Sequence, residues 1–201
     1  MKFLAIDTSG RALNVVAVNG EKEVVSRRDD CAMRHSVILM EEVERVLHEA
    51  GLSPCGCDFY ACVVGPGSFT GIRIGIATVK GLCLAADKKA LALTSFDALA
   101  YADTDGKRLC LVDAGHGNFY ACGYEGGTVV LPPAFCSREE VETLIARGFA
   151  PVAHSPLFEG VQAVDAAKGL LRAAKAKAGD TCGAHALEAL YLRKSSAEEA
   201  R

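Results

Sequence analysis

The 201-residue chain contains no tryptophan, few aromatic residues (6%) and almost no charge imbalance, with a net charge of −3. The slightly acidic balance excludes a strong global attraction to nucleic acid or to an anionic membrane. No apolar run approaches the ~18 residues of a membrane span, so we expect no membrane association. Met1-Lys2 leads directly into an apolar strand pattern. We therefore expect no signal peptide and a cytoplasmic protein.

Patterns for disulfide frameworks, metal sites and common hydrolases are also missing. The nine cysteines are an odd number, and most lie inside apolar segments, which is typical of free thiols in a reducing compartment. The close pair Cys55 and Cys57 has no second pair to complete a zinc site. The chain has no His-Glu-x-x-His string and no Gly-x-Ser-x-Gly elbow. Half of the residues are apolar, however, which is enough for a sizeable core.

The most specific motif is residues 63–75, Val-Val-Gly-Pro-Gly-Ser-Phe-Thr-Gly-Ile-Arg-Ile-Gly. An apolar strand over 59–64 enters a Gly-Pro-Gly turn, and Ser68 stands where the N-cap of the next helix belongs. Such a turn exposes backbone N–H groups that favour an anion or an acceptor on a partner. The candidate anion contacts at this turn are Gly65, Gly67, Ser68 and Thr70.

Two glycines follow on one face of that helix. Gly71 and Gly75 are one turn apart, and Thr78 continues the stripe. Glycine inside a helix costs about 1 kcal/mol relative to alanine, so two of them on one face predict a close approach of another backbone. Packing against the chain's own sheet and a helix contact between chains are both compatible with this stripe.

The chain also repeats itself. Residues 3–18 and 109–124 are each an apolar strand ending in aspartate, a small-residue turn and a second apolar strand, so that Asp7 aligns with Asp113. Each unit continues with a third strand (22–28 and 128–131), a helix and a further strand (59–64 and 149–153). The pattern predicts an α/β protein with lobes 1–104 and 105–201, the second of them shortened.

Helix signals complete this plan. The first helix is expected over 32–50, and the second lobe's first helix begins at Ser137, where Ser137 and Glu140 form a capping box. Further helices are expected over 166–178 and 184–193. The duplicated order resembles the actin/hexokinase/Hsp70 (RNase H-like) superfamily, in which the aspartate hairpins face a nucleotide. That resemblance makes Asp7, Thr8, Ser9 and Asp113 candidate nucleotide contacts, and the alternative is that both aspartates cap their own turns.

The helix expected over 32–50 is apolar on two stripes. One stripe suffices for docking on a sheet, and it comprises Ala32, Ser36, Leu39, Val43, Val46 and Ala50. A second stripe comprises Met33, Val37, Met40 and Leu47. A second apolar stripe favours a partner helix, and the alternative is a helix sandwiched within its own chain.

Several strings together resemble one family, the TsaB (YeaZ) proteins of tRNA threonylcarbamoyladenosine formation. They are Leu4-Ala5-Ile6-Asp7-Thr8-Ser9, His35-Ser36, the segment 65–73, Lys80-Gly81-Leu82, Val112-Asp113-Ala114 and Leu190-Tyr191-Leu192-Arg193. The resemblance covers the first lobe strongly and the second in patches. It implies a non-catalytic paralogue that binds the catalytic subunit TsaD, with the ATPase TsaE as third partner and a homodimer in isolation.

The resemblance also implies that the first two helices of the first lobe form the dimer interface. The partner-interface residues expected from it are Met33, His35, Ser36, Val37, Met40, Leu47, Gly71, Arg73, Gly75 and Thr78. We expect no required cofactor, no metal and no catalytic residue in the chain, with ATP or ADP a candidate ligand at the interface of the complex. We also expect no tight binding of tRNA by the chain alone, because a basic patch laced with aromatic residues is missing.

Departures from the family pattern separate the rival functions. The catalytic paralogue has two metal-binding histidines four residues apart, whereas here His35 is followed by Leu39, so His35 is expected to be a cap or a packed side chain. The family's proline before Leu-Tyr-Leu-Arg is replaced by Ala189. One alternative is a phosphotransferase or ATP hydrolase that uses the cleft between Asp7 and Asp113. Another is a metallopeptidase, which the missing histidine disfavours.

Overall fold

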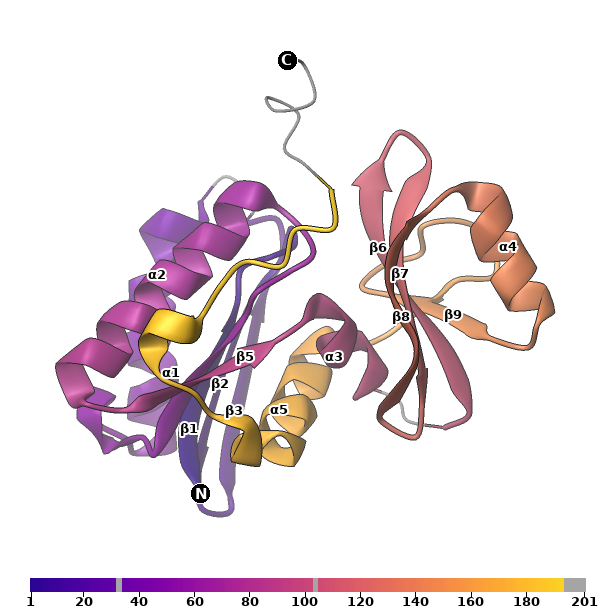
Figure 1. The fold of residues 1–201 in the computed structure, drawn as a ribbon. Helices are drawn as coiled ribbons and strands as arrows, with labels where there is room; N and C mark the ends of the chain where they lie inside the picture. Colours follow the sequence, from indigo (N-terminus) through magenta and orange to yellow (C-terminus); the bar gives the residue numbers. More distant parts are fainter. Residues whose placement is uncertain (32–33, 103–104, 194–201) are drawn as a thin grey trace.

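The computed structural model describes residues 1–31, 34–102 and 105–193, which form two five-stranded sheets beside one another (Figure 1). The first sheet has the order β3-β2-β1-β4-β5. Its strands are β1 (Lys2–Asp7), β2 (Leu13–Asn19), β3 (Lys22–Arg28), β4 (Phe59–Val63) and β5 (Lys89–Leu93). β1, β2 and β3 form an antiparallel meander, and β4 and β5 continue the sheet parallel to β1. The two-sheet α/β fold agrees with the duplicated pattern of the sequence.

Helices cover both faces of this first sheet. α1 (His35–Ala50) and α2 (Phe69–Ala86) pack together on one face, and α5 (Ala166–Ala176) packs on the other (Figure 1). β1, β2 and β4 are buried on both sides because each face has its own apolar cluster, whereas the edge strand β3 is mostly exposed. As a consequence, α1 and α2 share one layer and present their outer sides together.

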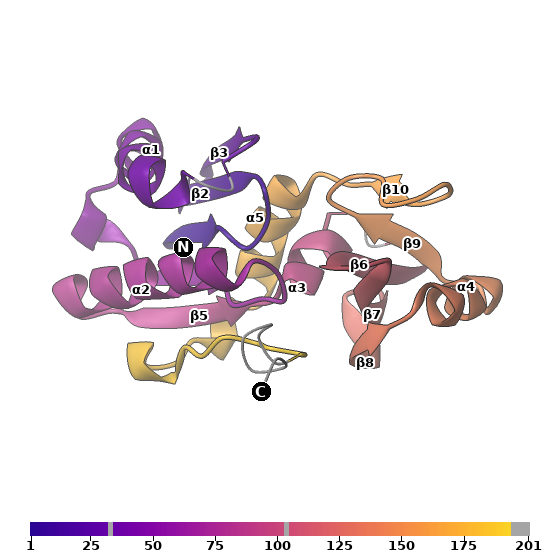
Figure 2. The same cartoon turned by 90° about the horizontal axis from the view of Figure 1, so that it is seen from above.

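The second sheet has the order β10-β9-β6-β7-β8. Its strands are β6 (Lys107–Gly115), β7 (Asn118–Glu125), β8 (Thr128–Cys136), β9 (Ala150–Ala153) and β10 (Gln162–Ala163). α4 (Arg138–Ala146) covers one face, and its expected capping box is confirmed, since Ser137 and Glu140 bond each other's backbone. The short helix α3 (Ser95–Ala100) contacts β6, β7, β9 and α5, so it lies between the two sheets (Figure 2).

The C-terminal part of the chain returns to the first sheet. α5 packs on β1, β2, β3 and β5, and Cys182 pairs its backbone with Ala90. Farther on, the Leu190 N–H donates to the Val64 carbonyl over 2.8 Å. The division expected at residue 104 therefore separates the two sheets, but residues 166–192 lie with the first of them.

Two expected helices differ from the structure. The helix expected over 184–193 is wrong: only a short 3-10 turn, Ala184–Ala186, forms before an extended tail. After this turn, the Leu190 N–H bonds the Val64 carbonyl of the first sheet rather than a carbonyl of its own segment. α1 begins at His35, and the expected start at Ala32 and Met33 lies outside the described residues.

One helix, α2, meets the length and mean hydropathy of a membrane span although it is not a continuous apolar run. Its 18 residues are long and apolar enough to cross a membrane, by length and composition only. The helix nevertheless packs on β1 and β4, with Ile72 and Val79 fully buried, as a core helix of a globular domain does. Length and composition alone are weak evidence that α2 spans a membrane. Only 28% of the residues of this helix are buried. Two large apolar side chains of α2, Phe69 and Leu84, remain exposed.

Candidate functional site

The Gly-Pro-Gly turn packs against the turn that follows β1. The Ser68 N–H donates to the Ser9 carbonyl over 2.7 Å, and a β-carbon on Gly67 would overlap that same carbonyl. Ser68 caps α2 as predicted, because its hydroxyl accepts from the Gly71 N–H over 3.2 Å. The expectation that this turn presents all its amides outward is therefore wrong for Ser68, whose amide is occupied within the chain.

The glycine stripe on α2 also faces its own chain. A β-carbon on Gly71 would overlap the Thr8 carbonyl oxygen, and one on Gly75 would lie 2.7 Å from the Thr8 hydroxyl. That hydroxyl donates to the Gly71 carbonyl over 2.7 Å and is fully buried. Of the two compatible explanations, packing within the fold is correct. Gly71 and Gly75 are not partner-interface residues, and Thr8 is not accessible to a nucleotide.

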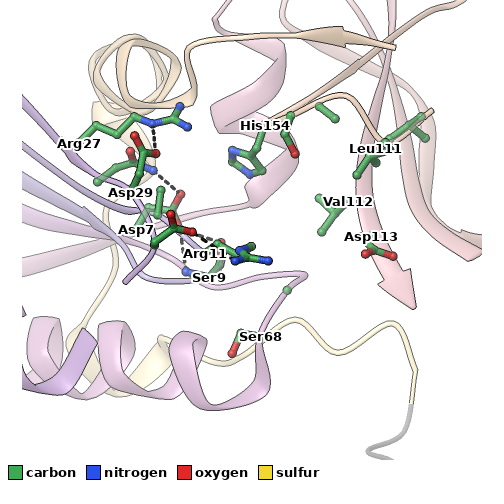
Figure 3. A pocket seen from close by; sticks show the side chains of 18 residues that line it. Asp7, Ser9, Arg11, Arg27, Asp29, Ser68, Leu111, Val112, Asp113 and His154 are labelled. Atoms are coloured by element: carbon green, nitrogen blue, oxygen red, sulfur yellow. Dashed lines mark hydrogen bonds and ion pairs between the residues drawn. The ribbon is translucent and has the colours of Figure 1, made fainter. Parts of the chain in front are cut away.

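A pocket of about 760 Å³ lies between the two lobes (Figure 3). From the candidate contacts it brings together Asp7, Ser9, Gly67 and Ser68 of the first lobe with Asp113 of the second. Thr70 does not line it but is exposed on the first turn of α2. Gly65 does not line it either, because the tail covers it: a β-carbon there would lie 2.8 Å from the Leu190 carbonyl oxygen.

Both aspartates of the repeat cap their own turns. One oxygen of Asp7 accepts from the Ser9 N–H (2.9 Å) and from the Ser9 hydroxyl (2.7 Å), while the other accepts from the Asn14 amide (3.2 Å). Asp113 accepts from the Gly115 N–H over 2.8 Å. Asp7 is buried and Asp113 is exposed. The structure thus realises the turn-capping alternative at both positions, and it places both carboxyl groups at the pocket.

The pocket is more acidic than basic. Its two arginines are each paired, Arg11 with Asp30 at 3.2 Å and Arg27 with Asp29 at 2.8 Å. His154 projects from the second lobe toward them (Figure 3). Burial lowers the pKa of His154, and Arg27 lowers it further against the opposing effect of Asp7. At neutral pH the histidine therefore adds no cation that could balance the aspartates.

Sequence reasoning missed the residues of this pocket that lie outside recognisable motifs. Arg11, Asn14, Arg27 and His154 belong to turns and strand ends whose meeting depends on how the two lobes pack. Their spacing along the chain carries no signal for this. In the described part of the chain, no group of three or more His, Cys, Asp or Glu side chains could hold a metal ion.

Two of the residues expected to contact a partner through α1 are buried inside the chain. His35 and Leu47 are each 2% exposed, and Leu47 belongs to the core beneath the helix. Both are therefore wrong as partner contacts. Helix α1 has Arg34 at its N-cap, so His35 is a packed side chain, and burial lowers its pKa. Met33 lies outside the described residues.

The remaining interface candidates form an exposed surface. Val37 is 72% exposed and Met40 is 54% exposed on α1, with Ser36 beside them. On α2, Arg73 is exposed and Thr78 is half-buried, and the sequence analysis missed Leu84, which is 79% exposed. We call this set the α1–α2 surface: Ser36, Val37, Met40, Arg73, Thr78 and Leu84. It joins the outer sides of two helices that pack together.

Comparison with known proteins agrees with this architecture. Residues 23–151, more than half of the chain, match the family model described as TsaD: tRNA N6-adenosine threonylcarbamoyltransferase. The structure of YeaZ from Pseudomonas aeruginosa superposes with a TM-score of 0.81 at 25% identity, covering 95% of this chain and 99% of that one. The two-lobed fold expected from the sequence is thereby confirmed.

Sequence relatives point in the same direction. The chain is 30% identical over 127 residues to the tRNA threonylcarbamoyladenosine biosynthesis protein TsaB of Bacillus subtilis, covering 62% of this chain and 56% of the relative. It is also 30% identical over 129 residues to the Escherichia coli protein of the same name, covering 62% and 55%. The chain thus matches about half the length of these curated relatives. The resemblance to TsaB (YeaZ) proteins is confirmed, and the chain belongs to the family described as TsaD: tRNA N6-adenosine threonylcarbamoyltransferase.

Proposed function

We propose that this chain is a non-catalytic subunit required for the formation of threonylcarbamoyladenosine on tRNA. It docks through the α1–α2 surface on a TsaD-type catalytic subunit, works with a TsaE-type ATPase and pairs with a second copy of itself when alone. The names of the relatives support the pathway, because two of them are tRNA threonylcarbamoyladenosine biosynthesis proteins. The tRNA itself contacts the catalytic subunit in this proposal.

The exposed α1–α2 surface is the observation that carries the proposal. Val37 and Met40 each expose more than half of an apolar side chain and lie one turn apart near the start of α1, while Leu84 is exposed near the end of the neighbouring helix α2. Large apolar side chains grouped on one face mark interaction sites, and methionine suits such surfaces. The neighbouring helix α2 has a high mean hydropathy and adds the exposed Leu84 near its end.

The absence of catalysis is supported at α1. The position four residues after His35 is Leu39, which is 2% exposed and packed in the core. The metal pair of the catalytic paralogue therefore has no counterpart there. No cofactor is required of this chain in the proposal, and ATP or ADP is a candidate ligand at the interface of the complex.

The proposal is tested by placing a charge on the α1–α2 surface. Val37→Glu or Met40→Glu would bury an unpaired carboxylate in an apolar contact, which costs several kcal/mol, so affinity for the catalytic subunit should fall at least about 100-fold. The matched control is Val25→Glu on β3, since Val25 is 41% exposed and faces away from α1, because its neighbour Val24 is the one packed in the core beneath α1. Titration calorimetry measures affinity, and far-UV circular dichroism checks folding. Normal binding by both folded variants would place the interface elsewhere.

A further inference from the structure

The C-terminal tail contributes a side chain to the edge of the α1–α2 surface. The rings of Phe69 and Tyr191 stack with centroids 5.0 Å apart and an angle of 26° between their planes. The Arg73 guanidinium carbon lies 3.7 Å from the Phe69 ring centroid, and Arg73 Nε donates to the Tyr191 hydroxyl over 3.0 Å. Three exposed side chains, from the start of α2 and from a tail 118 residues away, form one cluster.

This cluster orders an arginine at the surface. An exposed arginine samples many rotamers and loses that freedom when it binds a partner. Stacking on Phe69 and the bond to Tyr191 fix the guanidinium plane before any partner arrives. Within the described residues, the two Nη groups of Arg73 have no hydrogen-bond or ion-pair partner. The prearranged fork fits a carboxylate, which it can bind through two parallel hydrogen bonds.

The same surface carries unpaired carboxylates on α1. Glu41 and Glu44 are exposed on the side of α1 that carries Val37 and Met40, because positions 37, 40, 41 and 44 share a helix face. Neither glutamate has an ion-pair partner in the described part of the chain. In contrast, Glu42 and Glu49 of the same helix are both paired with Arg45, at 2.6 and 2.8 Å.

We propose that Arg73 of one copy pairs with Glu41 or Glu44 on α1 of a second copy, and that Tyr191 is the positioning residue that holds Arg73 for this contact. The inference rests on the proposed docking through the α1–α2 surface. It commits to a second copy because one chain carries both halves of the charge pair on the same surface. A two-fold axis then forms the contact twice, since each copy presents the same patch to the other.

Charge reversal tests the pairing. The dimer dissociation constant is measured by sedimentation equilibrium, and Arg73→Gln should raise it at least about tenfold, because each dimer loses two charge-assisted contacts. Arg73→Glu alone and the double change Glu41→Arg with Glu44→Arg alone should each be monomeric. An equimolar mixture of the two should dimerise again, because opposite charges then face each other at both contacts. A mixture that stays monomeric, or an unchanged constant for Arg73→Gln, overturns the pairing.

A double-mutant cycle tests the role of Tyr191. Tyr191→Phe keeps the ring and loses the bond to Arg73, so it should weaken dimerisation less than Tyr191→Leu, which loses both. In the Arg73→Gln background neither change should weaken the dimer further, whereas a role in anchoring the tail alone would give the same loss in both backgrounds. The salt dependence of the dissociation constant should fall with Tyr191→Leu and Arg73→Gln alike. Equal losses in both backgrounds would overturn the positioning role.

The Val37→Glu variant separates this inference from the proposed function. If Val37→Glu abolishes self-association and Arg73→Gln leaves it unchanged, the docking surface stands and the charge pair is wrong. If neither variant affects association, the surface itself is wrong. If the chain is monomeric alone and Arg73→Gln weakens binding to the catalytic subunit, the carboxylate belongs to that subunit and pairing with a second copy is overturned.

Discussion

Gly71 lies directly against the carbonyl oxygen of Thr8, so that α2 meets the end of β1 with no side chain between them. Gly71→Ala should lower the free energy of unfolding by about 1–3 kcal/mol, the usual cost of overpacking, because backbone must move to admit the methyl group. Chemical denaturation measures the change.

The matched control lies on the same helix. Gly81 is exposed and has nothing within 4 Å of an added β-carbon. Gly81→Ala should therefore raise the free energy of unfolding by up to about 1 kcal/mol through helix propensity. Opposite signs for the two variants are expected, and a stabilising Gly71→Ala would contradict the close approach.

A buried carboxylate fastens the second sheet to the first lobe. Asp97 of α3 accepts from the Tyr124 hydroxyl of β7 over 2.9 Å and from Lys177 over 2.6 Å. Tyr124→Phe should lower the free energy of unfolding by about 1–3 kcal/mol, since a charge in the interior loses one donor. Tyr120→Phe is the control, because no hydrogen bond of the Tyr120 hydroxyl is found in the described residues. Equal stability of the two variants in thermal unfolding would argue against the role of Asp97.

Glu42 makes the free energy of unfolding depend on pH in the acidic range. Burial would raise the pKa of Glu42, but hydrogen bonds from Arg45, Ser26 and Arg28 outweigh burial and lower the pKa to about 2. Because the folded pKa lies below the unfolded value of 4.5, the unfolded state binds more protons between these values. The stabilisation, up to about 3 kcal/mol, is present above pH 4.5 and is lost as the pH falls toward 2.

Glu42→Gln should remove that dependence while keeping the shape of the side chain. Denaturation curves recorded between pH 2 and 5 should show a shallower slope of stability against pH in the variant than in the parent. Glu21→Gln is the control, since Glu21 is exposed and has no ion-pair partner within the described residues. A parent curve that is flat over this range would contradict the ion-pair network at Glu42.

Local signals in the sequence predicted most of the framework. Hydrophobic runs and small-residue turns located both aspartate hairpins, and Ser68 and Ser137 were recognised as caps because capping depends on residues three apart. The helix expected over 184–193 failed for the opposite reason. Within that segment the Leu190 N–H bonds the carbonyl of Val64, a partner more than 100 residues away that no local pattern reveals.

Burial at the site depended equally on distant packing. Leu47 and Val37 were assigned to one stripe, yet Leu47 packs in the core beneath α1 and Val37 is exposed. The glycine stripe was compatible with packing inside the fold and with a contact between chains, and the sequence does not say which backbone faces it. In the structure that backbone is Thr8 of the same chain. The residues Arg27 and His154 line one pocket only because the two lobes pack, so their proximity could not be predicted from the chain order.

The interlobe pocket leads to a final prediction, that the chain alone does not hydrolyse ATP. The oxygens of Asp7 are occupied by Ser9 and Asn14, and both arginines of the pocket are paired with aspartates. Phosphate transfer requires cationic groups or metal ions placed on the transferred group, whereas both pocket arginines here face aspartates of the same lobe. Phosphate release should therefore equal the buffer rate with Mg²⁺ present. The Asp7→Ala variant distinguishes a contaminating ATPase from an activity of the chain itself. If ATP hydrolysis purifies with the chain and disappears in the folded variant, the chain is an enzyme that uses the cleft and not a non-catalytic subunit.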